Sequence, residues 1–140
     1  IYIMGYSAGG YYAMASTLDL IKDGVNIKGQ ILCYAFIGDI MEQFATLTDE
    51  QKQNIPSALF ILAGDEPISK GSLAYEALIR ENSIHTNVKV YDEAKHGFIE
   101  ENNPEYEVLH KKNKTSKSPE AEVIARQAEQ YINDWMLGAK

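Results

Sequence analysis

The residues best suited to chemistry in this sequence are five consecutive ones, Gly5-Tyr6-Ser7-Ala8-Gly9. They follow the apolar run Ile1–Met4 and precede a segment with helical spacing. A G-x-S-x-G turn between a strand and a helix holds its serine in a strained backbone conformation, so that the hydroxyl projects from the sheet. We therefore predict that Ser7 is a catalytic nucleophile. The alternative interpretation is a glycine-rich turn without chemistry.

The neighbours of Ser7 have predicted roles of their own. The backbone N–H of Ala8, at the start of the helix, would face the oxyanion that develops on an attacked carbonyl. The dipole of that helix favours negative charge at the same place. We expect glycine at Gly5 and Gly9 because a Cβ at either position would collide with the neighbouring backbone.

A serine nucleophile needs a base to take its proton, and imidazole is the usual one. His96 directly follows the predicted strand Val88–Tyr91, whereas His85 precedes that strand and His110 lies in a polar stretch. We therefore predict that His96 is the base and that the other two histidines are bystanders in solvent.

A carboxylate is expected to fix the tautomer of that imidazole and to stabilise its protonated form. Asp65 and Glu66 stand in the loop that follows the apolar run 57–63. Either side chain is able to accept a hydrogen bond from an imidazole N–H. Both therefore remain candidates for the acid.

The elements that must position these groups alternate between helices and strands. Nearly continuous apolar runs at 29–37 and 57–63 are typical of parallel strands buried on both faces. We also expect a helix over Ala8–Lys22, a short helix after a Thr48–Gln51 capping box, a strand over Val88–Tyr91 and a solvated loop over 100–117. Ser69 is expected to cap a further helix, whose apolar face carries Leu73, Ala74, Ala77 and Leu78. Ser118-Pro119 opens a last helix, whose apolar face carries Val123, Ile124, Ala128, Tyr131, Ile132, Trp135 and Met136.

This alternation predicts an α/β fold with a mostly parallel sheet flanked by helices, in a single domain over residues 1–140. Ligands of such sheets bind at the carboxyl ends of the strands. Ser7, the Asp65-Glu66 loop and His96 all follow strands, so we expect them to gather on one rim.

Composition excludes several classes of partner. Among 140 residues, 45% are hydrophobic and 24% charged, as in an ordinary globular protein, and the net charge of -7 argues against binding to nucleic acid or anionic membranes. A small uncharged substrate fits better.

The single cysteine, Cys33, lies in an apolar run and is expected to be a buried thiol. No cluster with metal-ligand spacing occurs, and we expect neither a metal nor a cofactor.

The sequence opens at Ile1 within a predicted strand, without an initiator methionine, a signal peptide or an apolar span of membrane length. We interpret it as a piece of a longer chain, with the cytoplasm as the default location.

Four segments, GYSAGG, ILCYAFI, ILAGDEPISKGSLAY and KHGF, together resemble the C-terminal half of an α/β-hydrolase esterase. They are similar to the hormone-sensitive-lipase-like carboxylesterases and the related acetyl-xylan-esterase-like enzymes, from Ile1 to the last helix. The resemblance implies a Ser-acid-His triad in that chain order. It also implies hydrolysis of small or acetylated esters through an acyl-enzyme.

The family motif A-G-x-D-P-L sets the choice of acid. An ungapped match puts Glu66 at the acidic position, and a shift by one residue gives Asp65 instead. We favour Glu66.

In these families a glycine-rich loop of the N-terminal half supplies the second oxyanion donor, and this sequence holds no such segment. Ala35 also stands where the families often have proline.

Two other functions compete with the esterase. A serine peptidase of the prolyl-oligopeptidase type uses the same half-fold and the same residue order, and a catalytically silent binding module would keep the fold alone. In addition, Ile1–Met4 would be a central strand of a whole hydrolase sheet. Left as an exposed edge, it is expected to support homo-oligomers.

Overall fold

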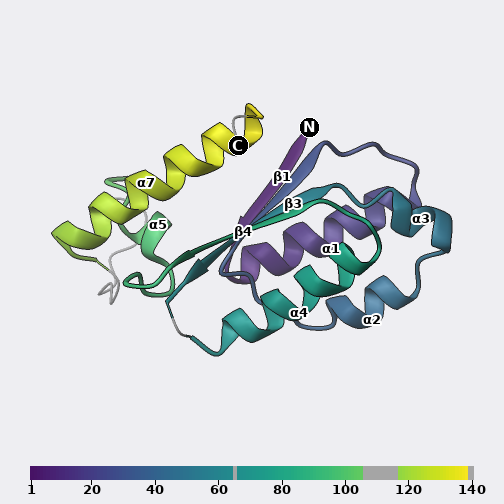
Figure 1. The fold of residues 1–140 in the computed structure, drawn as a ribbon, viewed down its shortest axis with the longest axis horizontal. Coiled ribbons are helices and arrows are strands. Elements are labelled where there is room, and N and C mark those ends of the chain that lie inside the picture. Colours follow the sequence, from purple (N-terminus) through teal and green to yellow (C-terminus); the bar gives the residue numbers. More distant parts are fainter. Residues whose placement is uncertain (65, 106–116, 139–140) are drawn as a thin grey trace.

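The computed structural model describes residues 1–64, 66–105 and 117–138. They form a four-stranded sheet with helices on both faces (Figure 1). The elements in chain order are β1 (Tyr2–Tyr6), α1 (Ala8–Lys22), β2 (Gly29–Cys33), α2 (Ile40–Ala45), α3 (Asp49–Gln53), β3 (Ser57–Ala63), α4 (Ile68–Glu81), β4 (Thr86–Tyr91), α5 (Phe98–Glu101) and α7 (Pro119–Met136). All neighbouring strands are parallel, in the order β1-β2-β3-β4. The expected α/β fold is therefore confirmed.

The helices divide between the two faces because of this strand order. Right-handed crossovers that always advance in one direction put their helices on the same face, which here carries α1 to α4. After β4 the chain crosses to the opposite face, where α5 and α7 pack (Figure 1). Leu32 and Phe60 face the first core, and Ile31 and Ile61 face the second. Burial of β2 and β3 on both faces, expected from their apolar runs, is confirmed.

Several helix boundaries follow the local signals that predicted them. The helix over Ala8–Lys22 has the expected bounds. Thr48 and Gln51 form the capping box before α3, and the Ser118 hydroxyl accepts from the N–H of Ala121 at the start of α7. The apolar face of α7 is also as expected, except that Val123 is exposed.

The strand expected over 29–37 ends earlier, at Cys33. Tyr34 has a φ of 37°, which no strand residue adopts, and its N–H donates to the carbonyl of Ile61 at 2.7 Å. Tyr34 and Ala35 are nevertheless completely buried. The apolar run therefore continues into a buried turn at the rim of the sheet.

The expected apolar face of α4 is only partly correct: Leu78 packs against the first core, but Leu73 and Ala74 are exposed. Its buried residues are Ser72, Tyr75, Glu76 and Ile79, whereas Leu73 is 43% exposed. Two of these side chains are polar and hydrogen-bonded: the Ser72 hydroxyl donates to the carbonyl of Ala35, and the Glu76 carboxylate accepts from Arg80 and Thr86. The Tyr75 ring makes edge contacts with Phe44 and Phe60 in the first core.

The caps and loops beside α4 and α5 also differ from expectation. Ser69 lies inside the first turn of α4, because the helix begins at Ile68, after Pro67. Glu100 belongs to α5 and is half-buried, so the solvated loop expected from this residue onward is wrong at its start. The rest of that expectation, including His110, falls mainly outside the described residues.

β1 lies at one edge of the described sheet. The last turn of α7 is bonded to both edge strands: the Trp135 indole donates to Asn87 of β4 at 2.9 Å, and the Tyr2 hydroxyl of β1 donates to the carbonyl of Met136 at 2.8 Å. Met4 in the middle of β1 is 39% exposed. In the described part of the chain, no helix combines the length and the apolar character needed to cross a membrane.

Candidate active site

Ser7 occupies the turn between β1 and α1, with φ 54° and ψ -119°. A serine in this conformation is strained, and the surrounding backbone holds it there. Its N–H donates to the carbonyl of Cys33 at 2.9 Å, and its carbonyl accepts from the N–H of Phe36 at 3.0 Å. The strained conformation predicted for Ser7 is confirmed.

The glycines around this turn have unequal roles. A Cβ at Gly5 would lie 2.1 Å from the carbonyl oxygen of Gly9, as predicted. The prediction for Gly9 itself is wrong, because a Cβ there would meet nothing within 4 Å. The close approach is made instead by Gly10, where a Cβ would lie 2.4 Å from that of Ala35. Helix α1 therefore meets the rim at its third residue.

We predict that Gly5→Ala destabilises the protein by about 3 kcal/mol or more, because the added methyl group meets backbone that cannot move aside. Gly9→Ala is the matched control. It should be neutral or stabilising by up to about 1 kcal/mol, since alanine is the better helix former. Urea denaturation of the complete protein measures both free energies of unfolding. Equal effects of the two substitutions would contradict the geometry.

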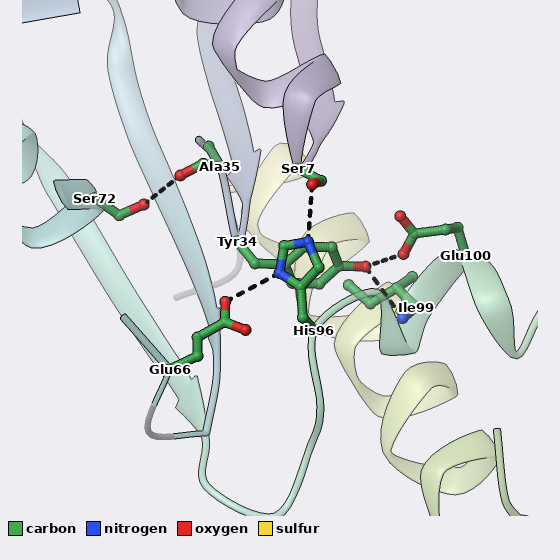
Figure 2. A network of polar contacts seen from close by, with 8 residues as sticks. All are labelled: Ser7, Tyr34, Ala35, Glu66, Ser72, His96, Ile99 and Glu100. Atoms are coloured by element: carbon green, nitrogen blue, oxygen red, sulfur yellow. Dashed lines mark hydrogen bonds and ion pairs between the residues drawn. The ribbon is translucent and has the colours of Figure 1, made fainter. Parts of the chain in front are cut away.

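Ser7, His96 and Glu66 are joined by hydrogen bonds (Figure 2). The distance from Ser7 Oγ to His96 Nε2 is 2.8 Å, and that from His96 Nδ1 to Glu66 Oε1 is 3.1 Å. With the imidazole proton on Nδ1, the serine hydroxyl donates to Nε2 while Nδ1–H donates to the carboxylate. The side chains of His96 and Glu66 are 35% and 17% exposed. A hydroxyl, a base and a carboxylate thus stand in the order that nucleophilic catalysis uses.

Parallel topology brings these three side chains to one rim. They follow β1, β3 and β4, whose carboxyl ends meet at the same edge of the sheet. The loops that carry the last two pass close together, because a Cβ at Gly64 would lie 2.8 Å from the carbonyl of Ala94. Gly64 has a φ of 48°, which also favours glycine at this position.

The other sequence candidates have different outcomes. Asp65, the alternative acid, lies outside the described residues. His85 precedes β4, at the amino end of the strands and away from the rim, where its imidazole contacts Asn87 Oδ1 at 3.1 Å. Ala8 is the first residue of α1, and N–H groups at this position have no acceptor within their helix. Its predicted place beside an oxyanion remains a prediction.

A shallow apolar pocket of about 250 Å³ lies between the loops that follow β2 and β3. It is lined by Phe36, Ile37, Gly38, Pro67, Ile68 and Gly71. Pro67 directly follows Glu66, and the Phe36 N–H is bonded to the Ser7 carbonyl. The pocket therefore borders the hydrogen-bonded group on the side of α4.

Two further residues adjoin this site and carry no signal in the sequence: Tyr34 packs against His96, and Glu100 binds Tyr34. The Tyr34 ring lies 5.0 Å from the imidazole, centroid to centroid, and the Tyr34 hydroxyl donates to the Glu100 carboxylate. Tyr34 stands within an apolar run and Glu100 within a polar stretch. Neither residue type nor spacing signals that the two meet.

A parallel sheet with a strained serine at the turn from a strand to a helix defines an α/β-hydrolase fold. Comparison with family models matches residues 1–132 to the dienelactone hydrolase family, and the chain belongs to that family. The superfamily expected from the sequence is therefore confirmed. The narrower resemblance to hormone-sensitive-lipase-like and acetyl-xylan-esterase-like enzymes is not what this comparison found.

Solved structures share the fold at low sequence identity. A hyperthermophilic esterase from the archaeon Pyrobaculum calidifontis is 20% identical, with a TM-score of 0.57 over 91% of this chain and 53% of its own. A dienelactone hydrolase-like promiscuous phosphotriesterase from metagenomic libraries is 16% identical, with a TM-score of 0.58 over 94% of this chain and 50% of its own. The chain thus spans about half the length of these structures. No curated protein matches it.

Proposed function

We propose that the protein containing this chain is a serine carboxylesterase that hydrolyses small or acetylated esters through an acyl-enzyme. The observation that carries the proposal is the hydrogen-bonded series from the Ser7 hydroxyl through His96 to Glu66. Membership of a hydrolase family supports it, as does a structural neighbour described as an esterase. The pocket beside Pro67 offers an apolar surface for part of the ester.

In the first half of the proposed reaction, His96 Nε2 takes the proton of Ser7 as Oγ attacks the ester carbonyl carbon. The carbonyl π bond breaks, and its electron pair moves to the oxygen, where the Ala8 N–H and the dipole of α1 stabilise the negative charge. Collapse of this intermediate breaks the bond to the alcohol oxygen. The alcohol leaves with the proton held on His96, and the acyl group stays on Ser7.

The second half repeats these steps with water. His96 takes a proton from water, the resulting nucleophile attacks the acyl carbon, and the proton returns to Ser7 Oγ as the carboxylic acid leaves. Throughout, Glu66 accepts the Nδ1–H of His96, which keeps Nε2 turned toward Ser7 and stabilises the imidazolium.

Comparison of substrates tests this function against its two rivals. We expect the complete protein to turn over an activated acetate ester and to leave a proline-containing peptide amide uncleaved. The reverse preference would favour a peptidase of the prolyl-oligopeptidase type. Absence of both activities in a folded protein would favour a silent binding module.

A further prediction concerns a polypeptide of residues 1–140 alone. β1 is an apolar edge strand in the described sheet, and such edges template association. We expect this polypeptide to form oligomers or aggregates. Its hydrolysis of an activated acetate ester should be at least about a hundredfold slower than that of a longer chain that supplies a glycine-rich donor loop, because one oxyanion donor contributes about 10²- to 10³-fold to kcat.

Light scattering and ester turnover on both polypeptides measure the two effects. Met4→Lys, at an exposed position in the middle of β1, provides a control that should reduce association. A monodisperse 140-residue monomer with full activity would overturn the prediction.

A further inference from the structure

Tyr34 combines complete burial with an unfavourable backbone conformation. It is 0% exposed and has a φ of 37°, a region that bulky L residues rarely occupy. Such strain persists only where the surroundings enforce it, and it is concentrated at functional sites. Here the strained turn at the end of β2 places the Tyr34 ring against the imidazole of His96 (Figure 2).

The ring of Tyr34 packs against one side of the His96 imidazole. The two rings are 5.0 Å apart between centroids and inclined by 61°, an edge-type contact. On its other sides the Tyr34 ring contacts Tyr6, at 6.1 Å, and Phe98, at 5.7 Å. Contacts on several sides leave the ring little freedom to move.

The hydroxyl end of Tyr34 is held as well. It donates to the Glu100 carboxylate and accepts from the backbone N–H of Ile99 at 3.2 Å. Burial raises the pKa of Tyr34, and the charge of Glu100 raises it further, so the phenol remains a donor. Burial likewise raises the pKa of Glu100, and the hydrogen bond from Tyr34 opposes that rise.

His96 needs such support because its two hydrogen bonds do not fix it fully. Bonds at Nε2 and Nδ1 define a line through the ring, and the imidazole remains free to rotate about that line and to move sideways. The His96 side chain belongs to a loop and is partly exposed, and the solvent on its exposed side does not hold the ring in place. A displacement of about 1 Å at a catalytic group is able to cost about 10²-fold in rate.

We propose that Tyr34 is a positioning residue for His96 and that Glu100 in turn fixes Tyr34. The proposal rests on the proposed esterase function. Tyr34 takes no direct part in the bond changes at Ser7 or the ester. It acts by keeping the imidazole in line between Ser7 and Glu66 while the proton moves.

The test measures kcat and KM of the complete protein on an activated acetate ester. Tyr34→Leu removes the aromatic ring that packs against His96. It should lower kcat by about 10- to 100-fold, with KM changed less than about twofold. Tyr75→Leu is the matched control, because Tyr75 is an equally buried tyrosine in the opposite core. It should lower stability comparably and leave the kcat of the folded protein near that of the wild type.

Two milder variants keep the test decisive if Tyr34→Leu does not fold. Tyr34→Phe keeps the ring and loses the hydroxyl, and Glu100→Gln keeps the shape and loses the charge. Each should lower kcat several-fold, and the double variant should be hardly worse than either one, because the two groups act through one contact. The proton NMR signals of the His96 imidazole should shift in both single variants and stay in place in Tyr75→Leu.

The outcomes separate this proposal from the proposed function. A wild-type protein without esterase activity would refute the function. An active wild type whose Tyr34 and Glu100 variants keep its kcat and its His96 signals would overturn the positioning role alone. A loss confined to KM, or an equal loss of kcat in Tyr75→Leu, would overturn it too.

Discussion

Ser7→Ala and His96→Ala in the complete protein are each expected to lower kcat for an activated ester by about 10⁵- to 10⁶-fold. The reason is that nucleophile and base act as one unit: without the base the hydroxyl is a weak nucleophile, and without the hydroxyl the base has no proton to move. The two atoms concerned are 2.8 Å apart. The double variant should therefore be hardly slower than either single variant.

Steady-state kinetics with all three variants tests this non-additivity. His85→Ala is the matched control, because His85 precedes β4 at the far end of the strands and should leave kcat unchanged. Independent losses that multiply in the double variant would contradict a joint role. A large loss in His85→Ala would contradict the choice of base.

The second large effect is expected for Glu66→Gln. Glutamine preserves the size of the side chain, but its amide donates where the carboxylate accepts, which favours the wrong imidazole tautomer. We expect kcat to fall by about 10³- to 10⁴-fold while KM changes little. Asp65→Asn should be milder. Both variants are measured in the same ester assay, and the reverse ranking would move the acid to Asp65.

Local signals in the sequence predict the structure correctly where a few neighbouring residues determine it. The bounds of α1, the capping box before α3 and the Ser118 cap of α7 are all set by residues within one helical turn. Burial of β2 and β3 follows from uninterrupted apolar runs. The common rim of Ser7 and His96 follows from the parallel topology alone.

Contacts between residues far apart in the sequence cannot be predicted from such local signals. The polar face of α4 depends on Ser72 bonding to Ala35 and on Glu76 bonding to Thr86, and no periodicity reveals these pairs. Tyr34 leaves its strand because of the turn that it occupies, although its run of apolar neighbours continues. In the acidic loop, the choice between two adjacent carboxylates depends on backbone conformation, which spacing does not specify.

Covalent labelling of the complete protein with an alkyl phosphonate that bears a fluoride leaving group tests most directly whether Ser7 is the nucleophile. An activated serine attacks phosphorus and expels fluoride, so we expect one phosphonyl group per chain, located on Ser7 by peptide mass spectrometry. Labelling should be abolished in Ser7→Ala and nearly abolished in His96→Ala. A folded protein that stays unlabelled, or that is labelled at another residue, would contradict the assignment of Ser7 as the nucleophile.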